Sequence, residues 1–219
     1  MFFLALVAFA VSLLPAHPAA HESGVADRPG MSLSKGMFLV AARHLEDPLF
    51  GESVILLLEY SSRGTVGVIV NHPTGAKLSE IFPDIGRLRE RNDPIYAGGP
   101  VARQQMLLLL QSDAQPEESL QVFKDIYVTT SAAALKKMAE TLTPETRFRI
   151  CAGYAGWAPG QLEKEIARGD WTVVTADAVT LFDTDPAILW QELLQRNFLL
   201  EVRLKNALLW TRSGKERFM

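Results

Sequence analysis

From Gly153 to Ile166 the chain reads GYAGWAPGQLEKEI, and this segment decides more about the fold than any other. It is typical of a strand end, a glycine-containing turn with an aromatic side chain, and a helix start. Pro159 fits this interpretation, because a proline is well tolerated in the first turn of a helix. In the expected helix Leu162 and Ile166 are four residues apart, and therefore share the buried face. The segment predicts a sharp corner at the edge of a sheet.

Polar side chains gather at the same corner. Gln161 and Glu165 are four residues apart on another face of the expected helix, and Trp157 precedes them in the turn. Two interpretations stay open at this point. The corner is either a small polar site or a turn that its own hydrogen bonds hold in place.

The composition is that of a globular protein with a substantial core. Of the 219 residues 48% are apolar and 21% charged, which is enough for one large domain or two small ones. The net charge is −3, and no cluster of Lys and Arg is present to neutralise phosphates, so we expect no nucleic-acid partner. Cys151 is the one cysteine, which excludes an intrachain disulfide, and we interpret it as a small buried hydrophobe.

The N-terminal residues have the pattern of a signal peptide. Residues 2–14 carry no charge and are too few to span a bilayer comfortably, and small residues suited to cleavage follow at 15–20. No Lys or Arg precedes the apolar run, which is atypical. We expect a signal peptide at 1–20, a flexible lead-in at 21–34, and a periplasmic mature chain without a membrane span. The alternative is a cytoplasmic protein that starts at Met31.

Short apolar runs predict a sheet. Residues 54–58 and 66–70 flank a glycine-containing loop and predict a hairpin. Neither run alternates with polar residues, so both strands should be covered on both faces. Further strands are expected at residues 37–42, 94–97, 105–111, 121–129, 148–152, 171–175 and 179–182.

Helix signals complete the fold class. Ser131 is a good N-cap for a helix through Leu142, Gly169 should end the helix of the corner, and Pro186 should open a last helix. Strands and helices mix irregularly, which predicts an α+β single domain with a largely antiparallel or mixed β-sheet core flanked by helices. The domain is expected at 35–197. A C-terminal extension at 198–219 would be an added strand, a helix or a partner-binding segment.

Several motifs follow one another at a specific spacing. They are KGMFLVA at 35–41, DPLF at 47–50, GTVGVIVN at 64–71, GGPV at 98–101, the segment at 153–166, and Trp171. Together they resemble the YqgE/AlgH family of bacterial proteins over roughly residues 35–195. The resemblance implies an α+β fold around a β-sheet core and no established enzymatic activity. It also implies a regulatory role by name only, because that name rests on one member's effect on exopolysaccharide production.

The chain departs from the family pattern in three places. His72 stands where an Arg or Lys is common, so that a cation there depends on pH. The export-like N-terminus and the extension beyond Asn197 are also unusual. If the protein is exported, a role in transcription does not carry over from the family.

A candidate ligand or recognition face collects residues from these motifs. It is formed by Asn71, His72, Gly98, Gly99, Trp157, Gln161 and Glu165. The glycine pair offers backbone N–H groups of the kind that bind anions, and the expected helix adds the positive end of its dipole. A carboxylate or phosphate would suit such a face. In the structural interpretation, the glycines permit unusual turns, Asn71 caps a turn and Trp157 fills the core.

Catalytic signatures are lacking in the sequence. We find neither a G-x-S-x-G elbow nor the HExxH or CxxC spacing of a metal site, and His44 with Glu46 and Asp47 is better explained as a solvated turn. We therefore expect no cofactor and a non-enzymatic binding or regulatory module for an unknown protein or small ligand. The alternative is a hydrolase-like enzyme of unrecognised type with a polar site around Asn71, His72, Gln161 and Glu165.

Overall fold

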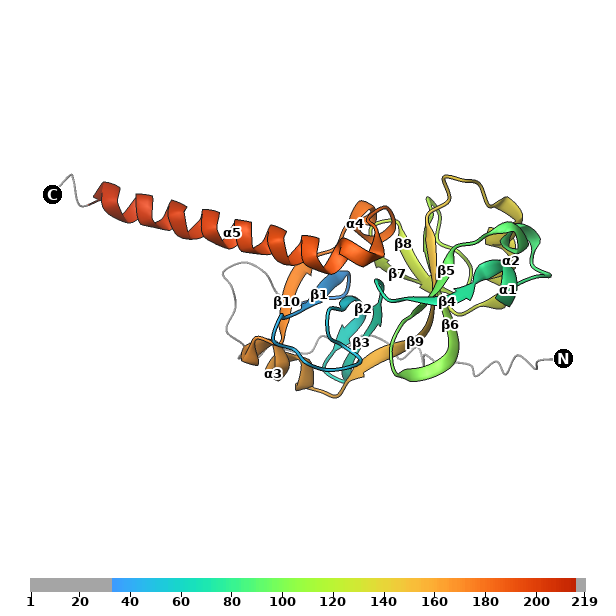
Figure 1. The fold of residues 1–219 in the computed structure, drawn as a ribbon, viewed down its shortest axis with the longest axis horizontal. Coiled ribbons are helices and arrows are strands. Elements are labelled where there is room, and N and C mark those ends of the chain that lie inside the picture. Colours follow the sequence, from blue (N-terminus) through green and yellow to red (C-terminus); the bar gives the residue numbers. More distant parts are fainter. Residues whose placement is uncertain (1–32, 216–219) are drawn as a thin grey trace.

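One curled sheet organises the molecule, with helices gathered at its two ends (Figure 1). The computed structural model describes residues 33–215, so the expected signal peptide at 1–20, Met31 and most of the lead-in at 21–34 lie outside it. The strands are β1 (Met37–Ala41), β2 (Val54–Ser61), β3 (Gly64–Ile69), β4 (Pro73–Lys77), β5 (Pro94–Ala97), β6 (Val101–Gln111), β7 (Ser119–Phe123), β8 (Ile126–Thr129), β9 (Phe148–Trp157) and β10 (Trp171–Thr175). The helices are α1 (Leu78–Ile81), the 3₁₀ helix η1 (Gly86–Glu90), α2 (Ala132–Thr141), α3 (Gln161–Arg168), α4 (Ala178–Phe182) and α5 (Pro186–Lys215).

The strand order is β10-β1-β2-β3-β9-β6-β8-β7, with β4 paired to β5 and β5 to β9. Neighbouring strands run antiparallel except β5 and β9, which are parallel. The expected α+β single domain with a largely antiparallel sheet is therefore confirmed. The predicted hairpin is also confirmed as β2 and β3, and Val54 to Leu57 are fully buried.

Strand β9 extends further than the sequence indicated. The expected strand ended at Ala152 and passed into a glycine turn, and this is wrong, because β9 continues through the glycines to Trp157. Its first half pairs with β6 and β5, and its last residues pair with β3, where Trp157 lies opposite Thr65. Pairing on both edges supplies the backbone hydrogen bonds that outweigh the poor strand propensity of glycine.

Two apolar cores lie on the two faces of the sheet, and β6 faces both. Its Leu107 and Leu109 join the larger core of β1, β2, β3 and α5, while Leu108 and Leu110 join a second core with α1 and α2. Because successive side chains of a strand point to opposite faces, this strand must be apolar throughout. The run of four leucines, expected to be a strand, is thus explained.

The residues just before α5 form a helix instead of the predicted strand at 179–182. Asp177 caps this short helix, α4: its Oδ1 accepts from the Thr180 backbone N–H at 2.9 Å and its Oδ2 from the Thr180 hydroxyl at 2.7 Å. The cap supplies acceptors that the first turn of a helix lacks, which favours helix over strand in a short apolar run.

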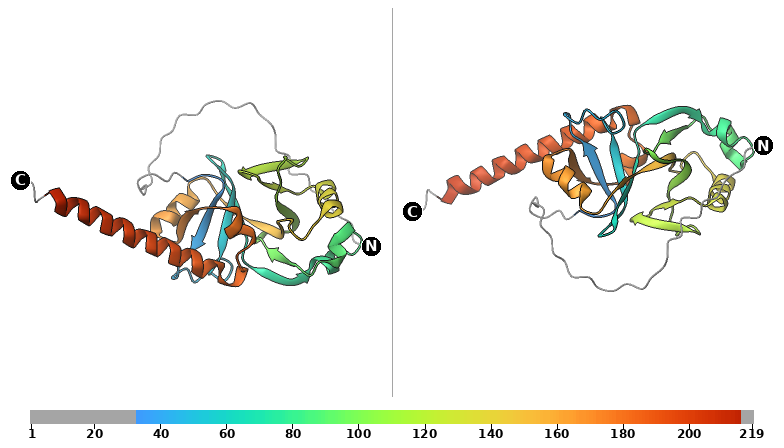
Figure 2. Two further views of the ribbon diagram at one scale, coloured as in Figure 1. Left: turned by 90° about the horizontal axis from the view of Figure 1, so that it is seen from above. Right: turned by 90° about the horizontal axis from the view of Figure 1, so that it is seen from below.

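Helix α5 runs from the body of the protein outward, and its first turns are firmly anchored. Leu189, Trp190 and Leu193 are buried against the large core, and the Trp190 indole donates to the Ala41 carbonyl at 2.8 Å. The helix is continuous across residue 197, where the extension was expected to begin. In every view its outer half points away from the sheet (Figures 1 and 2).

Candidate functional site

The corner of the segment at 153–166 lies between the end of β9 and the start of β10. Gly160 opens α3 in a left-handed conformation, with φ +73°, and Gly169 ends it in the same way, with φ +85°. Both conformations are readily adopted by glycine only. The eight-residue helix between them reverses the chain, so that Trp157 at its entrance and Trp171 after its exit stand side by side.

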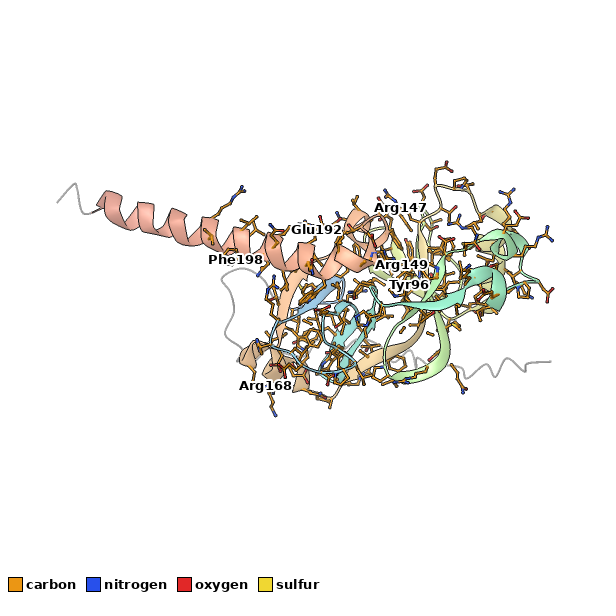
Figure 3. All side chains as sticks on the ribbon, viewed as in Figure 1. Tyr96, Arg147, Arg149, Arg168, Glu192 and Phe198 are labelled. Carbon is orange, nitrogen blue, oxygen red and sulfur yellow. The ribbon has the colours of Figure 1, made fainter. Side chains whose placement is uncertain are left out.

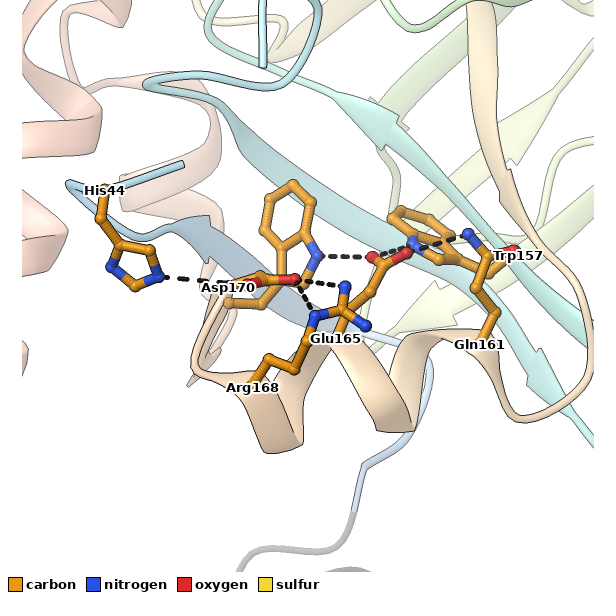
Figure 4. A network of polar contacts seen from close by, with 7 residues as sticks. His44, Trp157, Gln161, Glu165, Arg168 and Asp170 are labelled. Carbon is orange, nitrogen blue, oxygen red and sulfur yellow. Dashed lines mark hydrogen bonds and ion pairs between the residues drawn. The ribbon is translucent and has the colours of Figure 1, made fainter. Parts of the chain in front are cut away.

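A single carboxylate joins the two tryptophans (Figure 4). Oε2 of Glu165 accepts from the indole Nε1 of Trp157 at 2.8 Å and from that of Trp171 at 2.9 Å. Its other oxygen accepts from the Gln161 amide at 2.9 Å, and Gln161 in turn accepts from the Ala158 backbone N–H at 3.0 Å. Trp157, Gln161 and Glu165, three residues of the predicted face, thus form one hydrogen-bonded unit.

A loop before β2 brings a third ring to the two indoles. Asp47 Oδ1 accepts from the backbone N–H groups of Leu49 and Phe50 at 2.8 and 3.1 Å, which fixes a tight turn. The Phe50 ring then lies 6.5 Å from Trp157 and 6.0 Å from Trp171, measured between ring centroids. The two indoles meet edge to face at 6.2 Å, and the three rings form one aromatic cluster.

A pocket of about 300 Å³ opens over this cluster. It is lined by Leu45, Asp47, Phe50, Gly156, Trp157, Gln161, Glu165, Arg168, Asp170 and Trp171. We call it the α3 pocket. Arg168 donates to Asp170 Oδ2 at 2.6 Å, and the exposed His44 lies 4.0 Å from Asp170 Oδ1. Among the described lining residues three are acidic and one is basic, so the pocket is acidic.

The other members of the predicted face lie elsewhere. Thr65 of β3 pairs with Trp157, and Asn71 comes six residues further along the same strand and its extension. At about 3.3 Å per residue this separation is about 20 Å. Gln161 and Glu165 line the α3 pocket and Asn71 and His72 do not, so the four residues of the enzyme alternative do not share this pocket.

Asn71 is buried, and both polar atoms of its side-chain amide are hydrogen-bonded. Its Oδ1 accepts from the Val54 backbone N–H at 2.7 Å, and its Nδ2 donates to the Glu52 carbonyl at 2.9 Å. These bonds tie the end of β3 to the start of β2. His72 beside it is half-buried, and burial lowers its pKa, although the neighbouring Glu52 acts in the opposite direction. The cation that the family pattern has at this position is therefore disfavoured here.

Gly98 and Gly99 allow the backbone before β6 to pass very close to the backbone of β9. The Gly98 N–H donates to the Ala152 carbonyl at 2.8 Å, and its own carbonyl accepts from Ile69 at 2.8 Å. A Cβ on Gly98 would overlap the Gly153 carbonyl oxygen, and one on Gly99 would overlap the backbone of Tyr154. The Gly98 N–H is thus paired within the sheet, and the glycine pair is required by close backbone packing.

A buried arginine strengthens the same region. Arg149 on β9 donates to the Val70 carbonyl, and its guanidinium carbon lies 4.7 Å from the centroid of the Tyr96 ring. Both residues are labelled in Figure 3. Burial lowers the pKa of Arg149. No local pattern could indicate this contact, because Arg149 lies in an apolar strand whose neighbours are distant in sequence.

The cysteine and the possible metal ligands in the described part of the chain give no sign of a reactive centre. Cys151 is buried, and burial raises the pKa of its thiol to about 12. Residues 33–215 contain no group of three His, Cys, Asp or Glu side chains placed to hold a metal ion. Within the same residues, no helix has both the length and the apolar character that a membrane span requires.

Fold and corner together define a class: a single-domain α+β protein with a curled sheet, closed at one end by a short helix over an aromatic cluster. A family model described as AlgH-like matches residues 38–199, and the chain belongs to this family. The resemblance found in the sequence is thereby confirmed.

Relatives and solved structures agree with this assignment. A UPF0301 protein of Marinomonas sp. (strain MWYL1) is 38% identical over 154 residues, which cover 68% of this chain and 81% of the relative. The crystal structure of a Corynebacterium diphtheriae protein matches with a TM-score of 0.62 and 25% identity, over 76% of this chain and 88% of that one. The solution structure of AlgH from Pseudomonas aeruginosa matches with a TM-score of 0.59 and 33% identity, over 72% and 87%. None of these names states an activity.

Proposed function

We propose that the protein is a non-enzymatic binding module that takes up a cationic group, such as a lysine or arginine side chain of a protein partner, in the α3 pocket. The observation that carries this proposal is the Glu165 carboxylate, fixed by two indole N–H groups beside an aromatic pocket. If the module is regulatory, it would act by binding this partner through the same pocket.

Charge favours a cation in this pocket. Asp47, Glu165 and Asp170 bring three carboxylates to its lining and Arg168 brings one guanidinium. Glu165 is only half-buried, and Arg168 is exposed and already paired with Asp170. A cationic group close to several carboxylates in a partly desolvated pocket is stabilised more than it would be in bulk water.

The aromatic cluster favours the same ligand. Phe50, Trp157 and Trp171 all line the pocket, and the two tryptophans are nearly buried. The electron-rich ring faces attract a cation, and the aliphatic stem of a Lys or Arg side chain packs well on aromatic carbon. A small pocket with apolar walls and a few fixed polar groups is typical of a specific recognition site.

Catalysis receives less support from the geometry. A nucleophile needs a neighbouring base within hydrogen-bond reach. The Glu165 carboxylate already accepts hydrogen bonds from three donors. Of the polar residues that the enzyme alternative combined, Asn71 and His72 follow the end of β3, whereas Gln161 and Glu165 lie on α3. These observations support binding over reaction.

The proposal is tested by titrating the protein with N-acetyl-lysine amide and N-acetyl-arginine amide while following the indole N–H signals of Trp157 and Trp171 by NMR. We expect saturable shifts of both signals and no shift of Trp190, whose indole is bonded to Ala41. N-acetyl-glutamate amide is the control ligand. Equal shifts with the acidic ligand, or none with either basic one, would contradict the proposal.

A matched pair of variants separates the pocket from general charge effects. Asp170→Asn removes one carboxylate from the lining, whereas Glu192→Gln removes one from the exposed face of α5 (Figure 3). We expect the first to weaken binding of the basic probes severalfold and the second to leave it unchanged.

We propose, separately, that the protein is exported. The support is the uncharged run at 2–14 and the small residues that follow it. Cell fractionation with N-terminal sequencing tests this proposal. A periplasmic protein that begins near His17 or His21 is expected, whereas a cytoplasmic one that begins at Met31 would establish the alternative start.

A further inference from the structure

Strand β10 stands at one end of the sheet, and its outer edge has no partner strand in the described part of the chain (Figure 1). It pairs with β1, and the Ala42 N–H donates to the carbonyl of Asp170, the residue just before β10, at 2.9 Å. Because bonded residues alternate along an antiparallel ladder, Thr172 also bonds to β1. The backbone N–H and C=O groups of Trp171 and Val173 therefore point to the outer side.

The strand at the other end of the sheet, β7, is protected against further pairing, and β10 is not. On β7 the register with β8 shifts between Gln121 and Phe123, and the Lys35 ammonium group donates to the Gln121 carbonyl at 3.0 Å. Bulges, lysines and prolines commonly keep edge strands from pairing. Strand β10 reads WTVVT, without charge or proline, and its register with β1 is uninterrupted. Its aromatic and β-branched residues favour one more strand.

Solvent reaches this edge from both faces of the sheet. Thr172, Val173 and Val174 are all half-buried, although successive side chains of a strand point to opposite faces. Water can therefore satisfy the outward N–H and C=O groups until another backbone replaces it.

The α3 pocket lies at the start of the same strand. Asp170 and Trp171 both line it, and Val173 lies two residues beyond Trp171, about 7 Å along the strand. Residues directly opposite one another in a sheet carry their side chains on the same face. A residue added opposite Trp171 therefore has its side chain on the face of the Trp171 indole, which donates to Glu165 in the pocket.

The acidic lining of the α3 pocket indicates which strand fits the edge. Three carboxylates against one guanidinium favour a basic side chain opposite Trp171. Two copies of this chain paired through β10 would place one of the residues of WTVVT there, and none of these is basic. A separate segment with a Lys or Arg at that position satisfies both the backbone groups and the pocket.

We propose that the partner binds as an extended antiparallel strand on the outer edge of β10, paired with Trp171 and Val173, with a basic side chain in the α3 pocket. This proposal rests on the proposed function and adds the conformation and the position of the bound segment. The antiparallel direction gives the more stable ladder. Backbone hydrogen bonds supply affinity in such complexes, and side-chain pockets supply specificity.

Calorimetric titration of the full chain with short peptides tests the pairing. The probe is the acetylated and amidated peptide TTVKVTT, which we expect to bind at least about tenfold more tightly than N-acetyl-lysine amide. Two further peptides carry one backbone N-methyl group, either on the lysine or on the valine after it. The lysine N–H faces β10 in the proposed register, and that of the valine faces away. Methylation of the lysine should therefore raise the dissociation constant about tenfold or more, and methylation of the valine less than about threefold.

A matched pair of variants makes the complementary change in the protein. Val173→Pro removes an outward N–H and no hydrogen bond to β1, so the fold should be retained. We expect it to bind TTVKVTT about tenfold or more weakly and to bind N-acetyl-lysine amide as the parent does. Val173→Thr keeps the N–H and should bind both probes like the parent. The N-methylated peptides decide the question even if Val173→Pro does not fold.

The outcomes separate this proposal from the proposed function. If N-acetyl-lysine amide binds but methylation of the peptide lysine has no effect, the pocket stands and the strand pairing is overturned. If TTVEVTT binds as tightly as TTVKVTT, the basic side chain has no role and the pocket is overturned. Binding of neither probe overturns both. A dimer in sedimentation velocity that Val173→Pro dissociates would assign the edge to a second copy instead.

Discussion

Trp157 and Trp171 donate their indole N–H groups to the same oxygen atom, Oε2 of Glu165. One residue ends β9 and the other begins β10, so this shared acceptor closes the corner around α3. The two interpretations left open by the sequence are therefore not exclusive. Glu165 holds the corner in place, and it also fixes the wall of the α3 pocket.

Replacing Glu165 should separate these two roles. Glu165→Leu leaves two nearly buried indole N–H groups without an acceptor and should lower the free energy of unfolding by roughly 3 kcal/mol. Glu165→Gln keeps a neutral acceptor and should cost about 1 kcal/mol. Urea denaturation measures both. The exposed Glu192→Leu is the control, expected within about 0.5 kcal/mol of the parent. Equal stabilities of the Leu and Gln variants would contradict the shared-acceptor interpretation.

The close approach at Gly98 makes a strong prediction about packing. A methyl group there overlaps the Gly153 carbonyl oxygen, so Gly98→Ala should destabilise the protein by about 3 kcal/mol. Gly75→Ala adds the same methyl group where no atom lies within 4 Å, and should change stability by at most about 0.5 kcal/mol. Thermal unfolding of the two variants provides the comparison. If Gly98→Ala unfolds at the same temperature as the parent, the backbone at Gly98 does not approach Gly153 as closely as the structure shows.

Asn71 should be important for stability. Asn71→Ala leaves the buried Val54 N–H and the Glu52 carbonyl without their partner, and should cost about 2 to 3 kcal/mol. The exposed Asn92→Ala is the matched control and should be close to neutral. The measurement is the urea midpoint. A neutral Asn71→Ala variant would return this residue to the list of candidate ligand contacts.

His72 should make stability depend on pH. Its pKa is lowered in the folded state, so below the ordinary value of about 6.5 the unfolded chain binds more protons than the folded one. The folded state is then progressively disfavoured as the pH falls through this range. We expect His72→Gln to flatten the decline in urea midpoint on acidification. An equal decline in the parent and in His72→Gln would refute the assignment to His72.

The sequence predicted the fold class and most elements, because these depend on local patterns. Ser131 caps α2 as expected, accepting from the Ala134 backbone N–H at 3.4 Å, and Gly169 ends α3. The errors arose where distant pairing or a local cap prevailed. Neighbouring strands extended β9 through its glycines, and the Asp177 side chain turned an apolar run into a helix.

The candidate site could be predicted only within one corner. Helical spacing placed Gln161 and Glu165 together near Trp157, and the structure has them bonded to one another. Trp171 and Phe50 were missed as pocket residues. Trp171 follows Glu165 by six residues, just beyond the end of the helix at Gly169, and this short spacing could have indicated that the two side chains lie close together. No local pattern could show that Trp157 pairs with Thr65, at the end of β3 opposite to Asn71, because that depends on strand register.

The location of Cys151 has a consequence for the chemistry of the whole molecule. Its strand pairs with β5 on one edge and β6 on the other, opposite Tyr96 and Leu107. The thiol is fully buried in the larger core, so a reagent can reach it only when that core opens, and the raised pKa keeps little thiolate available in the folded state. The rate at which a thiol reagent modifies this single cysteine therefore measures how often the centre of the fold opens.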